Sequence, residues 1–430
     1  MTQWSEETLF GHPKGLYVLF LTEMWERFSY YGMRALLVYY MIKQLTFTQG
    51  EASQIYGLYT GLVYLTPLFG GILADRVLGQ RRTVILGAVL MAIGHFLMAF
   101  QSVFFPALLF LILGNGAFKP NISTQVGSLY PAGDPRRDRA FSIFYVGINL
   151  GAFFSPLVCG TLGEVYGWHY GFSAAGIGMV IGLLIYLSGQ RWLAPDNLME
   201  RELAGENALP SITTEEKNRM WGLIAVCLIS VAFWAAYEQQ GNTLALWADT
   251  NTDRLIFGWE FPASWYQALN PALVFLLTPV ITTLWAWQSN KQREPSAVTK
   301  MAFGCFLLAS GFLVMVPAAM SYAADGTPVS VLWLFFFTLL VTLGELYLSP
   351  VGLSLVTKLS PARIVSMMMG IWFLSSFIGN YAAGFLGHYW ERMPKDAFFL
   401  MIAAMAFCAG VAILLILRPL KRAMGRGQGM

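Results

Sequence analysis

The sequence predicts an all-α polytopic membrane protein with about twelve transmembrane helices, arranged as two pseudo-symmetric six-helix bundles. The first reason is composition: 56% of the 430 residues are hydrophobic and only 12% are charged, against roughly 25% charged residues in ordinary soluble domains. The second reason is that four long stretches contain no Asp, Glu, Lys or Arg, namely 83–100, 171–189, 330–343 and 397–417. Because backbone polar groups find no water inside a bilayer, we expect such stretches to cross it as helices.

Charged and polar residues bound the apolar segments and so delimit the expected spans. These are 16–42, 53–74, 82–100, 104–129, 140–163, 169–189, 220–247, 263–288, 298–320, 330–357, 363–388 and 396–418. The longest polar stretch lies between the sixth and the seventh span. We therefore expect an N-terminal six-helix bundle in 1–189, a cytoplasmic linker in 190–218, and a C-terminal six-helix bundle with a short cytoplasmic tail in 219–430.

The basic residues predict the orientation, because cytoplasmic loops carry an excess of Lys and Arg. Of the two sets of alternate loops, the set that includes both termini and the linker holds twenty Lys and Arg residues, and the other holds four. We therefore expect a multi-pass protein of the cell (plasma or inner) membrane with both termini in the cytoplasm. Two six-span halves joined by a cytoplasmic linker are the layout of major facilitator transporters, whose halves rock around a site near the middle of the bilayer.

Several classes of function find no support in the sequence. The net charge is +3, and no basic patch interleaved with aromatic residues indicates a nucleic-acid partner. The four cysteines lie in apolar segments without a CxxC pair, so no disulfide framework or zinc site is predicted. Walker A, HExxH and GxSxG motifs are absent. We expect no enzyme, no catalytic residues, no metal and no cofactor.

Charged residues inside the expected spans are the strongest indication of a functional site, because a central charge costs about 2.5–3.5 kcal/mol to insert. They are Glu23, Glu26, Arg27, Arg34, Lys119, Glu238 and Glu345. Those of the first span recur, together with Tyr30 and Tyr31, at spacings of three and four, which places them on one helix face. An arginine beside two carboxylates is a plausible proton switch, since moving the arginine away favours protonation of the buried carboxylate.

Pseudo-symmetry between the halves predicts two ion pairs across them. Lys119 and Glu345 lie in the fourth spans of their halves, and Arg34 and Glu238 lie in the first spans. The pairs either form and break as the halves rock, or only offset each other's desolvation as a static network.

Aromatic residues accompany these charges within the spans. They are Tyr30, Tyr31, Tyr64, Trp234 and Trp372. Together with the charges they describe a cavity suited to a zwitterion with variable side chains. Its carboxylate would meet Arg27 and Lys119, and its ammonium group would meet Glu345. For each aromatic residue taken alone, packing in the helix core is the alternative explanation.

The segment from Glu23 to Tyr31, Glu-x-x-Glu-Arg-Phe-x-Tyr-Tyr, resembles the signature of the proton-dependent oligopeptide transporters (the POT/PTR family), which belong to the major facilitator superfamily. The stretch 70–82 resembles the superfamily's loop between spans 2 and 3. The stretches 118–121, 144–151 and 345–352 resemble family motifs in spans 4, 5 and 10. The resemblance covers essentially the whole chain. The linker contains no apolar run, so we do not expect the additional spans that many bacterial relatives carry between their halves.

The resemblance implies a proton-coupled symporter that imports di- and tripeptides across the lipid bilayer by alternating access, functional as a monomer. It implies proton coupling by Glu23, Glu26, Arg27, Arg34 and Glu238. It implies substrate binding by Arg27, Tyr30, Tyr31, Tyr64, Lys119, Asn149, Trp234, Asn270, Glu345, Ser349 and Trp372. It implies gating by Asp75, Arg76, Lys119 and Glu345. Within the substrate set, Asn149, Asn270 and Glu345 would hold the peptide amino group, and Arg27, Tyr31 and Lys119 its carboxylate.

Three other functions remain open at the level of sequence. A symporter for another small anion or drug-like solute would share the scaffold, and competition by dipeptides would separate the two. A membrane-embedded peptidase would require a nucleophile with a base, or paired aspartates, within the spans. A passive channel would require a ring of like residues or a repeated pore loop, and the sequence shows neither.

Overall fold

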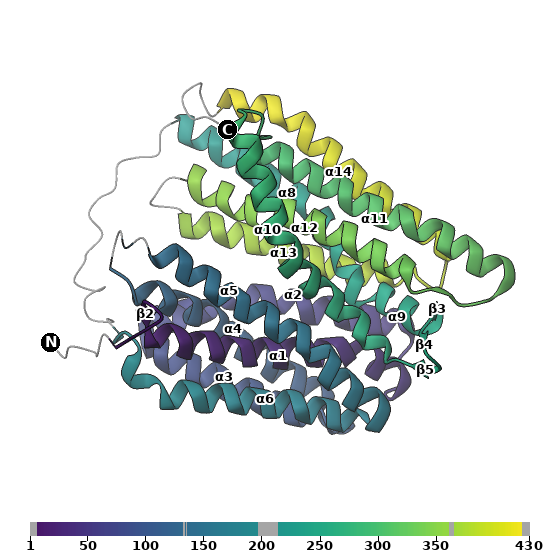
Figure 1. Ribbon diagram of the computed structural model, residues 1–430, viewed down its shortest axis with the longest axis horizontal. Helices are drawn as coiled ribbons and strands as arrows, with labels where there is room; N and C mark the ends of the chain where they lie inside the picture. Colours follow the sequence, from purple (N-terminus) through teal and green to yellow (C-terminus); the bar gives the residue numbers. More distant parts are fainter. Residues whose placement is uncertain (1–6, 132–133, 135, 197–213, 361–364, 424–430) are drawn as a thin grey trace. The chain divides into compact units, whose positions relative to one another are not determined.

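The structure, a computed structural model, describes residues 7–131, 134, 136–196, 214–360 and 365–423. Within these residues nearly all of the chain is helical (Figure 1). Ten of the described helices are long and apolar enough to cross a membrane. Two further long helices complete the predicted twelve: α1, which carries the charged stripe, and α3, which begins beside Arg81 and Arg82. The prediction of an all-α protein with twelve membrane helices is confirmed.

The first six spans follow the predicted order closely. They are α1 (Lys14–Lys43), α2 (Gln49–Leu73), α3 (Gln80–Leu97), α4 (Phe104–Ser128), α5 (Arg136–Ser155) and α6 (Trp168–Ser188). Two of them end in wider π-helical turns, α2 in Ala74–Leu78 and α5 in Pro156–Gly160 and Leu162–Tyr166. Pro156 removes one helix hydrogen bond at such a turn, which is where helices bend most easily.

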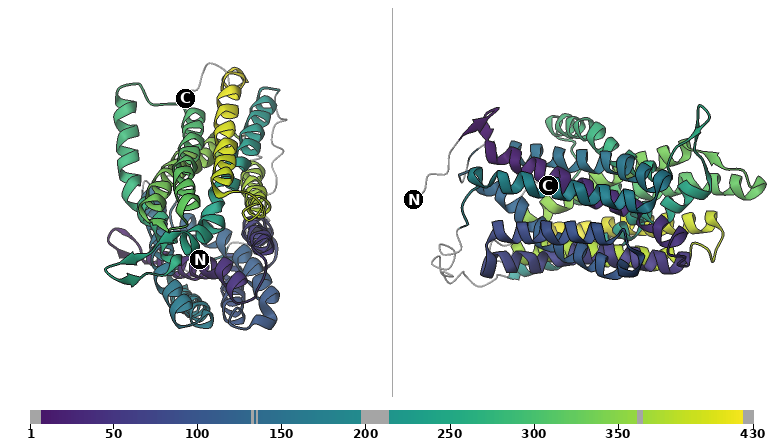
Figure 2. Two further views of the ribbon diagram at one scale, coloured as in Figure 1. Left: turned by 90° about the vertical axis from the view of Figure 1, so that its right-hand side faces the viewer. Right: turned by 90° about the horizontal axis from the view of Figure 1, so that it is seen from below.

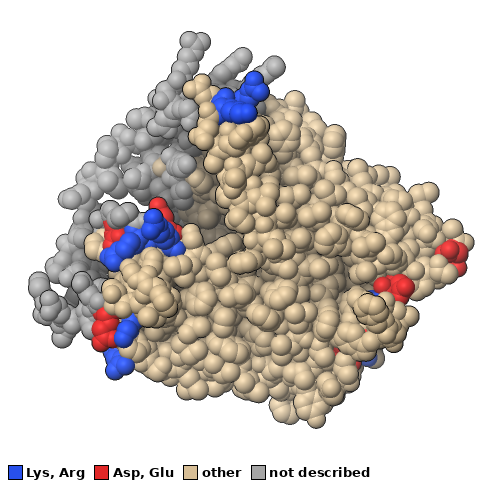
Figure 3. All heavy atoms as spheres, in the orientation of Figure 1, with Lys and Arg blue, Asp and Glu red and all other residues tan. Residues whose placement is uncertain are grey.

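The second six spans also match the predicted segments. They are α8 (Thr214–Tyr237) with α9 (Thr243–Thr250), α10 (Leu269–Asn290), α11 (Ala297–Asp325), α12 (Leu332–Leu359), α13 (Val365–Gly387) and α14 (Lys395–Ala423). The seventh span is interrupted by the 3₁₀ turn Glu238–Gly241, and the eighth begins with the 3₁₀ segment η7 (Ala263–Ala268). On the face drawn in Figure 3, charged side chains gather toward the ends of helices, and the surface between them is uncharged.

The start of the predicted linker packs against the N-terminus of α3. The backbone N–H of Arg81 donates to the carboxylate of Asp196 at 3.2 and 3.3 Å, and the Arg81 Nε donates to the carbonyl of Ala194 at 3.0 Å. Residues 197–213 of that linker lie outside the described residues, so the predicted division at 190–218 stays a prediction.

The helices group into two compact units, and within each unit they run side by side (Figures 1 and 2). The first unit comprises 1–46, 62–206 and 262–271, and the second comprises 47–61, 207–261 and 272–430. Each unit therefore includes one short segment from the other half of the sequence: the first part of α2 belongs with the C-terminal helices, and η7 belongs with the N-terminal helices.

Close backbone approach holds the first part of α2 within the second unit. A Cβ atom on Gly57 would lie 2.6 Å from the Cα of Gly384 on α13. Nearby, the Gln49 side chain donates to the carbonyl of Gly387 at 2.8 Å. Ser53 donates to the side-chain oxygen of Asn242 at 2.8 Å. Because lipid provides no hydrophobic force between helices, such small-residue contacts and polar bonds are what hold membrane helices together.

Hydrogen bonds to the end of the fifth span hold η7 within the first unit. The carboxylate of Glu164 accepts from the backbone N–H groups of Ala263 at 2.9 Å and Ser264 at 2.8 Å. The indole N–H of Trp265 donates to the hydroxyl of Thr161 at 2.9 Å. Glu164 thus satisfies the unpaired donors at the start of a helical segment, as an N-cap side chain does.

Two short hairpins have the same turn. In the first, β1 (Thr8–Leu9) pairs with β2 (His12–Pro13), and in the second, β4 (Leu255–Ile256) pairs with β5 (Trp259–Glu260). Both have a Phe-Gly tip with positive φ at each residue, 48° and 81° at Phe10 and Gly11, and 51° and 81° at Phe257 and Gly258. This is the backbone of a type I′ turn, which ordinarily carries Asn-Gly. A third pair, β3 (Thr252–Asp253) with β6 (Val329–Ser330), is parallel.

Polar contacts tie the first hairpin to the ends of α4 and α5. His12 Nδ1 lies 2.8 Å from the Tyr130 hydroxyl, and Arg136 donates to the carbonyl of Gly11 at 3.2 Å. Burial raises the pKa of Tyr130 to about 12, so its hydroxyl stays protonated at neutral pH. Hydrogen bonds from Arg136 hold the pKa of Asp134 below its usual range, which keeps that pair charged.

The glycine contact predicts a position-dependent effect of one methyl group on α2. Gly57→Ala should lower the free energy of unfolding by about 1–3 kcal/mol, because the new Cβ would clash with the α13 backbone. Thermal unfolding of the purified protein in detergent measures this. Gly71→Ala on the same helix is the control: a Cβ there meets nothing within 4 Å, so we expect no loss and a gain of up to about 1 kcal/mol. Equal effects at both positions would contradict the contact.

Candidate functional site

The polar face of α1 folds into a buried ion cluster. The Nε of Arg27 lies 2.9 Å from Glu23 Oε1 and 2.5 Å from Glu26 Oε2. All three residues are buried, with Glu26 completely removed from solvent. Two carboxylates and one guanidinium leave a formal excess of one negative charge at this point. Adding one proton to either carboxylate removes this excess negative charge.

One neighbour of the cluster comes from α4. The side-chain amide of Asn115 donates to Glu26 Oε1 at 3.2 Å, so Glu26 is held by Asn115 on one oxygen and by Arg27 on the other. Asn115 is not among the residues predicted from the sequence. A signal was present, since it lies one helical turn before Lys119 on the same helix and is therefore expected on the same side.

Glycine on α5 allows this part of α1 to be enclosed. A Cβ on Gly151 would lie 2.2 Å from the carbonyl oxygen of Met24 and 3.0 Å from the Cβ of Arg27. The α5 backbone therefore passes directly over the charged turn of α1. Asn149, also on α5, donates its side-chain amide to the carbonyl of Tyr145 at 3.0 Å.

Aromatic rings accompany the cations of the first unit. The guanidinium of Arg27 lies 5.5 Å from the ring centre of Tyr30, and that of Arg34 lies 5.9 Å from the ring centre of Tyr31. The ammonium of Lys119 lies 4.5 Å from the ring centre of Tyr64. Cation–π contacts of this kind stabilise a cation that is partly removed from water. Eight of the predicted residues lie in ion pairs or ring contacts within the first unit: Glu23, Glu26, Arg27, Tyr30, Tyr31, Arg34, Tyr64 and Lys119.

Some buried polar atoms of this cluster make no hydrogen bond. Within the described residues, Glu23 Oε2, Arg27 Nη2 and Asn115 Oδ1 are buried and make no hydrogen bond. Buried polar atoms are nearly always satisfied, so unsatisfied ones require an explanation such as a ligand or a functional ion. A guanidinium nitrogen with an unused donor suits a carboxylate, and a carboxylate oxygen with an unused lone pair suits a proton or an amine.

The second unit holds the other predicted acidic and aromatic residues. Glu345 on α12 accepts a hydrogen bond from the Tyr237 hydroxyl at 2.7 Å. The ring of Tyr237 lies 5.6 Å from that of Trp234 in an edge-to-face arrangement. Tyr237 was not selected from the sequence, although it directly precedes Glu238 and follows Trp234 by three residues. Glu238 is buried and begins the 3₁₀ turn that interrupts the seventh span.

The remaining predicted residues are placed as follows. Trp372 is buried on α13, and a Cβ on Gly352 would lie 2.2 Å from its ring, so glycine makes room for the indole. Ser349 is half-buried on α12, one turn after Glu345. Asn270 lies at the start of α10, in the segment that belongs to the first unit. Asp75 and Arg76 are exposed on the π-helical turn after α2.

The two predicted ion pairs, Lys119 with Glu345 and Arg34 with Glu238, each join residues of different units. They therefore stay predictions. Among the described residues, no group of three His, Cys, Asp or Glu side chains could hold a metal ion.

The ion cluster predicts a large effect of removing its cation. Arg27→Ala should lower the free energy of unfolding by about 3–5 kcal/mol at neutral pH, because it leaves the carboxylates of Glu23 and Glu26 buried without the guanidinium that pairs with them. Thermal unfolding in detergent measures the loss. The matched control is Arg82→Ala at an exposed position of α3, where we expect a change within about 0.5 kcal/mol. An Arg27 variant as stable as the control would mean that the cluster does not depend on the guanidinium.

Comparisons with known proteins agree on one family. The model described as "POT family" matches residues 81–201 and 204–406. A peptide transporter of Yersinia enterocolitica, YePEPT, is 37% identical over 98% of this chain and 97% of its own length. A di-/tripeptide transporter of Lactococcus lactis subsp. cremoris is 34% identical over 98% of each chain. The crystal structure of a peptide transporter, POT, in complex with alafosfalin superposes with a TM-score of 0.87 at 34% identity, covering 97% of each chain.

Proposed function

The chain belongs to the POT family of multi-pass membrane transporters and is not an enzyme, and from that premise we propose that it imports di- and tripeptides together with protons. The observation that carries the proposal is the buried cluster of Glu23, Glu26 and Arg27, with its unused guanidinium donor and carboxylate acceptor. The named substrates of the similar proteins, peptides and di-/tripeptides, support the same class of solute.

The first unit is suited to the carboxylate end of a peptide. Arg27 offers the unused Nη2 donor, and the Lys119 ammonium, placed over the ring of Tyr64, adds a second positive charge on α4. Charge-assisted bonds from a guanidinium and an ammonium are the strong contacts for a carboxylate. We propose that Tyr30, Tyr31 and Tyr64 complete this subsite, with Tyr31 donating its hydroxyl.

The second unit is suited to the amino end. Glu345 carries a negative charge that Tyr237 orients through its hydroxyl, and it is the group we propose for the peptide ammonium, together with Asn149 and Asn270. The indoles of Trp234 and Trp372, with Ser349, would line the space for the peptide side chains. Aromatic walls accept many side chains because they offer contact area without demanding one pattern of hydrogen bonds.

Proton coupling follows from the charge balance of the α1 cluster. The single positive charge of Arg27 can offset one of the two carboxylates but not both. When the guanidinium turns to a peptide carboxylate, a proton on one of the two glutamates replaces the lost positive charge. A proton on Glu26 would then release Arg27 for the substrate, and loss of the peptide would return Arg27 to its carboxylates. We propose that Glu23, Glu26 and Arg27 couple the two events in this way.

The remaining roles concern conformational change. We propose that the pairs Arg34 with Glu238 and Lys119 with Glu345 form and break as the two halves rock, and that Asp75 and Arg76 serve the gate at the cytoplasmic side. We also propose that both termini are cytoplasmic, that the protein acts in the cell membrane as a monomer, and that the divisions 1–189, 190–218 and 219–430 are its two bundles and linker. The bias of basic residues toward one set of loops supports the orientation.

Transport of a labelled dipeptide tests the proposal. In proteoliposomes with an inward proton gradient, wild type should accumulate radiolabelled dialanine, and removal of the gradient should abolish accumulation. Glu26→Gln should lose gradient-driven accumulation and retain exchange of peptide, because the amide cannot carry the coupled proton. Glu391→Gln, an exposed carboxylate on the loop before α14, is the control and should behave as wild type. Accumulation by Glu26→Gln at the wild-type level would exclude the proposed coupling site.

A second measurement tests the carboxylate subsite. Lys119→Gln should weaken binding of dialanine by about tenfold or more, since a charge-assisted hydrogen bond contributes roughly 1.5–3 kcal/mol. Binding of the C-terminally amidated dipeptide, which lacks the carboxylate, should be weak in the wild type and should change little in the variant. Isothermal titration of purified protein with both peptides gives the comparison. An equal loss of affinity for the two peptides would mean that Lys119 does not bind the peptide carboxylate.

The second candidate is a symporter for another small solute on the same scaffold. A solved structure of a POT family transporter contains bound 5-aminolevulinic acid; it is 29% identical to this chain and superposes with a TM-score of 0.87. Small amino-carboxylates of this kind are therefore the alternative substrates. If no di- or tripeptide is taken up by folded protein, or none competes with 5-aminolevulinic acid, this candidate replaces peptide symport.

A further inference from the structure

The hairpin of β4 and β5 presents apolar side chains to its surroundings. Leu255 is 62% exposed, Ile256 49% and Trp259 50%, and Phe257 at the turn is fully exposed. We call these four residues the hairpin tip. Clustered apolar side chains that a protein leaves uncovered mark a surface that contacts something else.

The backbone of the tip indicates that the phenylalanine is there for its side chain. Phe257 has a φ of 51°, in the left-handed region. A bulky residue is strained in this region, and a two-residue turn of this type ordinarily takes Asn followed by Gly. The chain therefore accepts backbone strain in order to carry an aromatic ring at the outermost point of the hairpin. Strain of this kind persists at functional positions.

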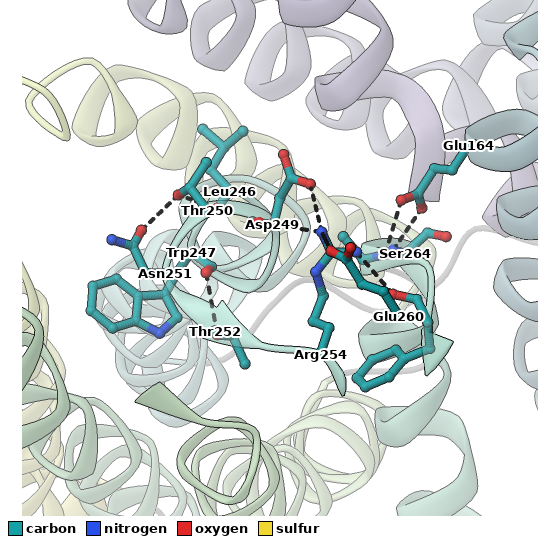
Figure 4. A network of polar contacts seen from close by, with 12 residues as sticks. Glu164, Leu246, Trp247, Asp249, Thr250, Asn251, Thr252, Arg254, Glu260 and Ser264 are labelled. Carbon is teal, nitrogen blue, oxygen red and sulfur yellow. Dashed lines mark hydrogen bonds and ion pairs between the residues drawn. The ribbon is translucent and has the colours of Figure 1, made fainter. Parts of the chain in front are cut away.

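The base of the hairpin is fixed in place, as Figure 4 shows. The Nη2 of Arg254 lies 2.7 Å from a carboxylate oxygen of Glu260 and 3.5 Å from one of Asp249, on α9. Its Nη1 donates to the carbonyl of Phe261 at 2.8 Å. One partly buried guanidinium thus links both sides of the hairpin to the end of the seventh span, so the tip is presented in a defined direction.

The position of the hairpin along the chain places it at the boundary of the bilayer. It lies between the end of α9 and the start of the eighth span, where the chain leaves and re-enters the membrane. Among the candidate spans of the described residues, the eighth is the least enclosed by protein. Its exposed apolar side chains include Phe275, Leu276 and Val280. The tip thus directly precedes, along the chain, a span that presents apolar side chains as a membrane protein does to lipid.

We propose that the tip of the β4–β5 hairpin inserts into the interfacial layer of the bilayer and anchors the connection between the seventh and eighth spans to the lipid surface. Trp and other aromatic residues are enriched at this depth, where the headgroups meet the acyl chains. This anchoring does not depend on which solute the protein transports.

The charge of the hairpin indicates whether it binds the lipid surface by apolar contact or by electrostatic attraction. The tip carries no ionisable side chain, and the residues 249–260 hold one basic side chain, Arg254, and three acidic ones, Asp249, Asp253 and Glu260. Anionic lipid therefore does not attract the hairpin; burial of apolar surface drives binding, and added anionic lipid should not strengthen it.

Site-specific fluorescence in proteoliposomes tests the proposal. Cys408 is the exposed cysteine of the described residues, so Cys408→Ser provides the background, and Phe257→Cys introduces the site for an environment-sensitive label. The expected result is blue-shifted emission, quenching by a nitroxide placed high on the lipid acyl chain, and protection from aqueous iodide. The quenching from the lipid should be no stronger in vesicles that contain phosphatidylglycerol than in vesicles of neutral phosphatidylcholine.

A matched control comes from the same end of the helices. Thr327 is exposed, lies two residues before β6, and is thereby close to β3 in space. A label on Thr327→Cys should be quenched by iodide and not by the lipid-borne nitroxide. The proposal is overturned if the label at 257 behaves like the label at 327, which would place the tip in water. It is equally overturned if the label at 257 is protected from both quenchers at one protein per vesicle, which would place the tip against protein.

A second variant separates anchoring from folding. Phe257→Asn suits the left-handed backbone, so the hairpin should be retained and the protein should be no less stable in detergent. With a label on Ile256→Cys, introducing Phe257→Asn should reduce quenching from the lipid and increase quenching by iodide. Unchanged quenching of the Ile256 label would show that Phe257 does not hold the tip in the bilayer.

Discussion

Arg27 lies between Glu23 and Glu26 on a single membrane helix, and all three side chains are removed from solvent. Taking each of these charges out of water costs several kcal/mol, which their mutual attraction repays only when the geometry is close and other bonds are added. The surrounding helices are arranged to meet this demand. Asn115 comes from α4 to Glu26, and the glycine at position 151 lets the α5 backbone close over the charged turn.

Close helix contacts elsewhere follow the same logic. Where lipid supplies no hydrophobic force, helices associate by van der Waals contact and polar bonds, and both require short backbone separations. A Cβ on Gly70 would lie 1.9 Å from the carbonyl oxygen of Gly116, so α2 can approach α4 beside Lys119 only because both residues are glycine. Gly57 and Gly384 allow the same approach between α2 and α13. Packing by glycine thus positions the polar residues.

Capping and ion pairing outside the spans then fix the chain at the ends of the helices. Glu164 receives the first N–H groups of η7, and Arg254 joins both strands of the β4–β5 hairpin to α9. The two contacts lie on either side of the same connection, each within its own unit. Because charged groups hold the connection on both sides of the hairpin, the apolar tip around Phe257 stays exposed.

The sequence by itself determined the number and order of the spans, the charged face of α1 and the family, because hydrophobic length, helical spacing and a contiguous motif are local properties of the chain. It did not reveal the partners that other helices supply, Asn115 for Glu26 and Tyr237 for Glu345. Nor did it reveal that the first part of α2 packs with the C-terminal helices, or that Phe257 would be held with positive φ at a hairpin tip. These features depend on how closely helices distant in sequence approach one another, and that separation is decided only when all of them pack together.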